Sequence, residues 1–170
     1  KLDLGNVKVY DFAVSGTSTK TFCKNSAIEA AKENDYVLIS FGHNDSTKGE
    51  ERSTTVDEYK ENIANMILQV MEKGAVPVII TSIPSFDGEN VIIGTDGVAP
   101  YRAAALEVAE EYSVPSIDLG TLLAQEGAAN TYFVEDNLHL NEAGATAAAE
   151  IVKAGLLNNS KIRTLKMYVQ

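Results

Sequence analysis

The stretch DYVLISFGHND, residues 35–45, joins an apolar run to a cluster of polar side chains. Residues Tyr36 to Ser40 are nearly all apolar, which is typical of a strand covered on both faces. His43, Asn44 and Asp45 follow where that strand should end. In a parallel sheet the chemistry gathers at the carboxyl ends of the strands, so this stretch predicts both a strand and a site.

Short apolar runs alternate with helical patterns along the rest of the chain. That alternation predicts βαβ units, and therefore an α/β fold with a parallel sheet and helices on both faces. The length of 170 residues favours one domain, residues 1–170. Further strands are predicted at Val7–Tyr10, Val76–Ile80 and Val114–Ile117. Helices are predicted at Ser26–Lys32, from the Thr55–Glu58 capping box to before Gly74, at Pro100–Tyr112, at Leu119–Gln125, from Asn141 to about Leu157, and at Ile162–Val169.

The polar clusters each follow a predicted strand. They are residues Ser15 to Ser18, His43 to Asp45, and Ser82 to Asp87, so we expect their loops to converge on one edge of the sheet. The stretch Phe86–Arg102 is the predicted substrate-facing loop, because long glycine-bearing loops after strands often carry specificity.

Composition and charge exclude several classes of partner. The net charge of −10 argues against nucleic acid and against an anionic membrane surface, and no apolar stretch is long enough to span a bilayer. Cys23 is the only cysteine, so no internal disulfide is possible. With two distant histidines and no cysteine pair, we expect no metal site and no cofactor. The compartment stays open, with an extracellular location favoured over a cytoplasmic one.

Asp136 and His139, in the run DNLHLNEAG, form the main late motif. An Asp three residues before a His can accept a hydrogen bond from one ring nitrogen, which leaves the other nitrogen as a general base for a hydroxyl nucleophile. The alternative is that Asp136 caps a turn and His139 is an ordinary surface residue. Taken alone, the spacing favours that alternative.

Gly16 and Asn44 strengthen the catalytic interpretation. A glycine after a strand lets its backbone N–H approach a ligand, and an Asn side chain is a donor of the kind that stabilises an oxyanion. A tight turn at Gly16 and an Asx-turn at Asn44 are the structural alternatives. His43 and Ser15 are predicted substrate contacts, and for Asp45 a structural role in orienting a loop is favoured.

Three motifs resemble those of the SGNH hydrolases, also called GDSL esterases, and are most similar to the rhamnogalacturonan acetylesterases among them. The segments are DFAVSGTSTKTF, DYVLISFGHND and DNLHLNEAGA, in the family's order. The resemblance implies a three-layer, flavodoxin-like fold. It also implies that Gly16 and Asn44 donate to the oxyanion, and that Asp136 and His139 complete a catalytic triad.

The family's first block, a Gly-Asp-Ser motif that carries the nucleophile, occurs nowhere in the 170 residues. We therefore expect the first strand and its Ser to lie upstream of Lys1 or on another chain. Their absence would leave a slot between the predicted Val7–Tyr10 and Tyr36–Ser40 strands. Ser15 and Ser18 flank Gly16, but neither matches the family's nucleophile position.

The predicted function is a serine esterase that removes O-acetyl or similar short acyl groups from an acetylated oligo- or polysaccharide, and a pectin-derived substrate is favoured. Two alternatives come from other classes. One is an inactive carbohydrate-binding relative that has lost the nucleophile. The other is a flavodoxin-like domain that binds a phosphorylated cofactor. That interpretation needs a glycine-rich loop that opens a helix and holds the phosphate, and the Ser15–Ser18 loop matches this pattern poorly. The oligomeric state is left open.

Overall fold

The computed structural model describes residues 2–22, 27–47, 49–84, 97–126, 129–162 and 164–168. Its sheet has three parallel strands in the order β1 (Tyr36–Ile39), β2 (Val76–Ile80) and β3 (Ser116–Ile117). Tyr36 pairs with Val76, and Ile80 pairs with Ile117. The predicted α/β class and parallel sheet are therefore confirmed.

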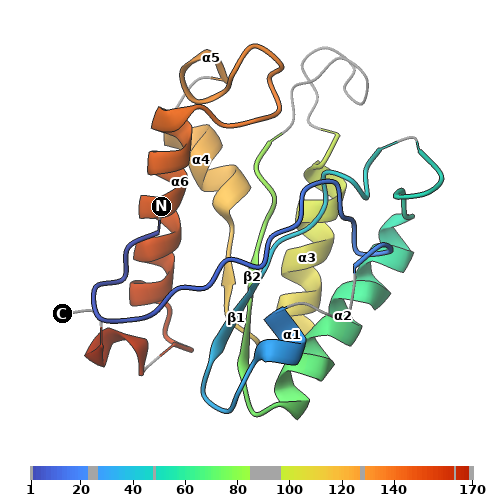
Figure 1. Ribbon diagram of the computed structural model, residues 1–170. Coiled ribbons are helices and arrows are strands. Elements are labelled where there is room, and N and C mark those ends of the chain that lie inside the picture. Colours follow the sequence, from blue (N-terminus) through green and yellow to red (C-terminus); the bar gives the residue numbers. More distant parts are fainter. Residues whose placement is uncertain are drawn as a thin grey trace.

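Helices cover both faces of this sheet, as predicted (Figure 1). The first core cluster lies between the sheet and α1 (Ala27–Ala30), α2 (Val56–Glu72) and α3 (Ala99–Glu111). The second lies between the other face and α4 (Leu119–Glu126), α6 (Glu142–Asn158) and η1 (Leu165–Met167). Alternate strand residues supply the two clusters, because successive side chains of a strand point to opposite faces. The short α5 (Ala129–Tyr132) precedes α6.

In helix α2, the local sequence determines where the helix begins and ends. Thr55 accepts a hydrogen bond from the Glu58 N–H, and the Glu58 carboxylate accepts one from the Thr55 N–H, so the predicted capping box is present. One apolar face of the helix is buried. The helix ends before Gly74, as predicted, and Gly74 has the positive φ of 70° that suits glycine after a helix. The buried stripe consists of Tyr59, Ile63, Met66, Ile67 and Val70.

The prediction of a strand at Val7–Tyr10 is wrong. The residues have no strand partner, and Val9 and Tyr10 are 46% and 71% exposed. The N-terminal segment instead passes from one helix layer to the other, since Leu4 packs in the second cluster and Phe22 against the first (Figure 1). Apolar alternation alone does not make a strand, because a strand also needs a hydrogen-bonded neighbour.

Strand β1 is consequently at the edge of the described sheet. Val37 and Ile39 are buried, but Leu38 is 37% exposed, so the prediction of cover on both faces holds for only one face. The Val76 N–H donates to the Asp35 carbonyl at 2.8 Å. Because bonding alternates along a strand, the N–H and C=O of Leu38 point away from β2.

The remaining sequence predictions need smaller corrections. Residues 99–102 of the predicted Phe86–Arg102 loop are helical and start α3, with Pro100 in its first turn, while residues 86–96 lie outside the described residues.

The Ser26–Lys32 helix is present but short, and its predicted cap lies outside the described residues, as does Cys23. Within the described residues of the helix predicted at Ile162–Val169, the structure has one 3₁₀ turn, Leu165–Met167, and Ile162 before it is fully buried. Over the described part of the chain, no helix is both long and apolar enough to cross a bilayer.

Candidate active site

Asp136 and His139 meet as predicted. The Asp136 Oδ2 lies 2.7 Å from the His139 Nδ1, and the Oδ1 accepts the backbone N–H of Leu138 at 2.8 Å and of His139 at 2.9 Å. These hydrogen bonds to His139 and Leu138 lower the pKa of Asp136 from its ordinary 3.8 to about 2. The carboxylate is thus ionised at neutral pH. It fixes the imidazole through Nδ1, while the side chain, 72% exposed, leaves Nε2 accessible.

A tight loop presents this pair. The Val134 N–H donates to the His139 carbonyl at 2.9 Å, and Phe133 bridges to Leu140 in antiparallel fashion. Asn137 takes the positive φ of 56° that the turn requires, a conformation Asn adopts more readily than most residues. Phe133 is buried in the second cluster and so anchors the loop to the core.

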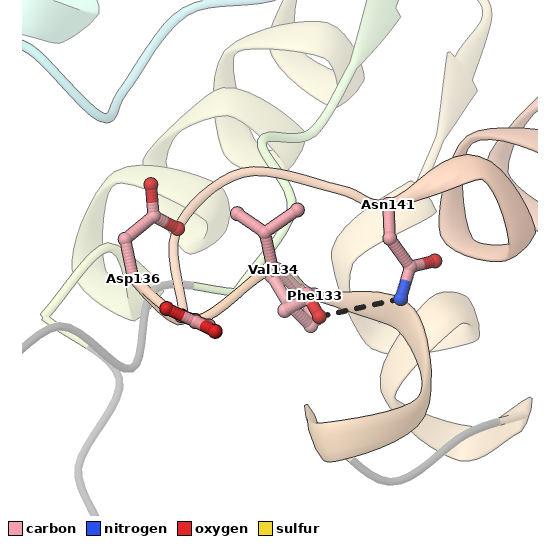
Figure 2. Close-up of a pocket in the computed structure, with 5 residues that line it drawn as sticks. Phe133, Val134, Asp136 and Asn141 are labelled. Atoms are coloured by element: carbon pink, nitrogen blue, oxygen red, sulfur yellow. Dashed lines mark hydrogen bonds between the residues drawn. The ribbon is translucent and has the colours of Figure 1, made fainter.

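Asn141 fastens the same loop to α6. Its Oδ1 accepts the Gly144 N–H at 2.9 Å, and its Nδ2 donates to the Thr131 carbonyl at 2.9 Å. The Nδ2 also donates to the Phe133 carbonyl at 3.2 Å, the hydrogen bond drawn in Figure 2. A Cβ at Gly144 would lie 2.2 Å from the Tyr132 carbonyl, so only glycine allows this approach. Figure 2 shows the open pocket beside the loop, which is lined by Phe133, Val134, Glu135, Asp136 and Asn141.

Gly16 lies in an exposed turn. The Thr17 N–H and hydroxyl both bond the Val14 carbonyl, at 3.4 and 2.8 Å, and Gly16 has a φ of 78°. A β-turn with positive φ at its third residue is the type that favours glycine there. Ser15, the predicted substrate contact, is exposed in this turn. Ser18 is fully buried and lies 3.3 Å from the Thr21 hydroxyl, which argues against it as a surrogate nucleophile.

Asn44 is tied to the Gly16 turn. Its Nδ2 donates to the Thr17 carbonyl at 2.9 Å, and its Oδ1 accepts from Arg52 at 3.0 Å. His43, the other predicted substrate contact, is half-buried in the turn after β1 that also contains Asn44. Its carbonyl accepts a hydrogen bond from the Ser46 hydroxyl at 2.8 Å. Arg52 is not predicted from the sequence, because nothing in the spacing of residues marks an arginine after the Asn44 motif as part of a site.

Asp45 holds the two loops together, in line with the structural role favoured for it. It is 1% exposed, and its Oδ1 accepts the Thr19 N–H at 3.0 Å and the Thr54 hydroxyl at 3.1 Å. The Thr19 hydroxyl also donates to it, and Asn62 of α2 donates to that hydroxyl at 3.1 Å. Burial is the largest influence on the pKa of Asp45 and raises it above 3.8, against the lowering effect of these hydrogen bonds.

The two groups of residues belong to loops at one edge of the sheet. The loop after β1 and the loop before α6 both lie beyond the carboxyl ends of the strands (Figure 1). Across the described ranges, no hydrogen bond or ion pair joins Asp136 or His139 to Gly16 or Asn44. The Asp136–His139 pair and the Gly16–Asn44 pair therefore form two separate groups of hydrogen bonds. No cluster of three or more His, Cys, Asp or Glu residues suited to a metal ion occurs in the described part of the chain.

Comparison with known proteins gives consistent matches. The GDSL-like Lipase/Acylhydrolase family matches residues 2–147. The probable rhamnogalacturonan acetylesterase YesY of Bacillus subtilis is 30% identical over 168 residues, covering 89% of this chain and 77% of its own. The rhamnogalacturonan acetylesterase RhgT of the same organism is 33% identical, with 88% and 74% covered.

Solved structures agree on the fold. The crystal structure of the Bacillus subtilis protein YxiM superposes with a TM-score of 0.66 at 30% identity, over 83% of this chain but only 43% of that chain. A catalytic mutant of Axe2, an acetylxylan esterase from Geobacillus stearothermophilus, gives a TM-score of 0.68 over 88% of this chain and 72% of its own. Its sequence identity of 16% supports the fold alone.

Proposed function

Because this chain belongs to the GDSL-like Lipase/Acylhydrolase (SGNH hydrolase) family, we propose that it serves as an esterase that removes O-acetyl or similar short acyl groups from a carbohydrate. An acetylated, pectin-derived oligo- or polysaccharide is the proposed substrate, since two relatives are named as rhamnogalacturonan acetylesterases. The single observation that carries the proposal is the 2.7 Å contact between the Asp136 carboxylate and the His139 ring.

The proposed mechanism is acyl transfer through a serine outside the 170 residues. The His139 Nε2 takes the proton from the Ser hydroxyl as its oxygen attacks the ester carbonyl, and the carbonyl electron pair moves onto oxygen. The Gly16 N–H and the Asn44 amide stabilise this oxyanion. His139 then gives its proton to the departing sugar alcohol, and water releases the acid by the reverse route. Asp136 holds the tautomer and stabilises the imidazolium; Ser15 and His43 contact the substrate.

The free edge of β1 supports this placement of the nucleophile. The Leu38 backbone groups point away from β2, so a further parallel strand has a row of partners there. A strand in that position would end at the same edge of the sheet as the Gly16 and Asn44 loops. A serine just after it would therefore stand between the oxyanion donors and His139.

The test uses the protein as its gene encodes it, including any sequence before Lys1, and the 170-residue chain for comparison. We expect the former to hydrolyse p-nitrophenyl acetate and acetylated pectin, and a fluorophosphonate probe to label one serine upstream of Lys1. The His139→Ala variant should lose both hydrolysis and labelling, whereas Glu150→Gln on the exposed side of α6 should keep both.

Two results would count against the proposal. Binding of acetylated pectin without hydrolysis of either ester would favour an inactive carbohydrate-binding relative. Equal activity of the 170-residue chain would place the nucleophile inside it.

A further inference from the structure

Arg52 lies beside the proposed oxyanion donors. The backbone N–H of Arg52 donates to the Gly49 carbonyl at 3.1 Å, and the backbone N–H of Thr54 donates to the Asp45 carbonyl at 3.0 Å. The segment before α2 is therefore folded back toward the Asn44 loop. The Arg52 guanidinium donates to the Asn44 Oδ1 at 3.0 Å. The same guanidinium nitrogen would be 3.7 Å from a Cβ at Gly16, so it borders both donors.

The contacts of Asn44 specify which end of its amide faces which neighbour. Arg52 offers only donors, and the Thr17 carbonyl offers only acceptor sites. The observed orientation satisfies both, with the Nδ2 donating to Thr17 at 2.9 Å. A flipped amide would set N–H against guanidinium and oxygen against oxygen, and both bonds would be lost. One N–H of Asn44 then remains without a partner among the described residues.

We infer that Arg52 is a positioning residue: it locks the Asn44 amide so that the remaining N–H points at the oxyanion. The inference rests on the proposed function, because it assigns a task within that reaction. In this role Arg52 acts only through Asn44. Among the described residues, no carboxylate forms an ion pair with Arg52.

The test compares Arg52→Met and Arg52→Lys in the full-length enzyme, with Lys20→Met as the matched control. Lys20 is exposed nearby and donates to the Glu50 carbonyl at 2.7 Å, so its loss removes the same charge without touching Asn44. We expect Arg52→Met to lower kcat about 10-fold at unchanged KM, because total loss of an oxyanion donor costs ~10²–10³. Arg52→Lys should recover part of the loss, and Lys20→Met should change nothing.

A double-mutant cycle shows whether the effect passes through Asn44. In an Asn44→Ala background, Arg52→Met should have no further effect; the same fractional loss there, or an unchanged kcat in the single variant, overturns the inference. Inactive wild-type enzyme would instead be a failure of the proposed function.

A second readout needs no turnover. The side-chain amide signals of Asn44 in a ¹H–¹⁵N spectrum of the full-length enzyme should shift and exchange faster with water in Arg52→Met. They should stay unchanged in Lys20→Met. Unchanged signals in Arg52→Met overturn the inference whether or not the enzyme is active, and the backbone signals report whether each variant is folded.

Discussion

The two halves of the candidate site are built in opposite ways. In the Asp136–His139 loop, the hydrogen bonds of the carboxylate span two or three residues. In the Gly16–Asn44 half, the bonds from Thr19 to Asp45, Asn44 to Thr17 and Asn62 to Thr19 span 26, 27 and 43 residues. One half is therefore fixed by its local sequence, and the other exists only when the whole domain is folded.

The aspartates of the two halves, Asp136 and Asp45, also differ in exposure and in the direction of their pKa shifts. Asp136 is exposed and accepts two backbone N–H groups and the imidazole, so its pKa is lowered to about 2. Asp45 is buried, and desolvation raises its pKa in spite of its hydrogen bonds. The first is kept charged for use in the proposed reaction. Asp45 instead holds two loops together. Burying its charge costs free energy, which its hydrogen bonds only partly offset.

The largest expected effect comes from the local half. Asp136→Asn keeps an Oδ1 for the two backbone N–H groups but puts an amide N–H where Oδ2 accepted from His139. That favours the wrong imidazole tautomer, so kcat in the full-length enzyme should fall by about 10³–10⁴ with the fold unchanged.

Glu142→Gln, the same chemical change six residues later on an exposed position, is the control and should retain full kcat. Steady-state kinetics on p-nitrophenyl acetate measure both variants. A loss in Asp136→Asn of less than tenfold would contradict the role of the pair.

The next effect is on stability and belongs to the long-range half. Asp45→Ala removes the acceptor of the Thr19 N–H and of two buried hydroxyls, so we expect the free energy of unfolding to fall by about 3 kcal/mol. Urea denaturation measures it. Asp136→Ala should lower the free energy of unfolding less, because its partners are exposed; a larger fall than in Asp45→Ala would reverse the comparison.

The same contrast explains how much the sequence alone predicts. The Asp136–His139 contact, the Thr55 cap and the Asn141 cap depend on residues three apart, so the motifs predict them directly. Strands β1 and β2 are also predicted, since short apolar runs of four and five residues are typical of buried strands.

What could not be predicted depends on distant neighbours. Arg52 reaches Asn44 only because the Thr54 backbone bonds back to Asp45, and no local pattern encodes that return. The segment Val7–Tyr10 has the apolar alternation of a strand but no partner beside it, so it crosses between the helix layers instead. The β-propensity of single residues is therefore not sufficient, because a strand forms only where a neighbouring strand pairs with it.

The two helix caps offer a smaller test of the comparison. Thr55→Ala removes one side-chain cap and should lower the free energy of unfolding by about 1 kcal/mol. Asn141→Ala removes a cap and also the two bonds that fasten the loop before α6, so about 2 kcal/mol is expected. Thermal or urea unfolding distinguishes them, and a larger loss in Thr55→Ala would show that Asn141 does not fasten the loop.

The smallest effect is the pH dependence, in which the two acids should act in opposite directions. Asp136 has a lowered pKa, so the stability it adds is complete above its ordinary value of 3.8 and is lost as the pH falls through about 2. Asp45 has a raised pKa, so its contribution is most favourable below 3.8 and declines as the pH rises toward its folded-state pKa. Carboxyl ¹³C shifts followed from pH 7 downward should therefore titrate first at Asp45 and last at Asp136. The reverse order, or coincident midpoints near 3.8, would mean that local hydrogen bonding and burial do not distinguish the two halves of the site.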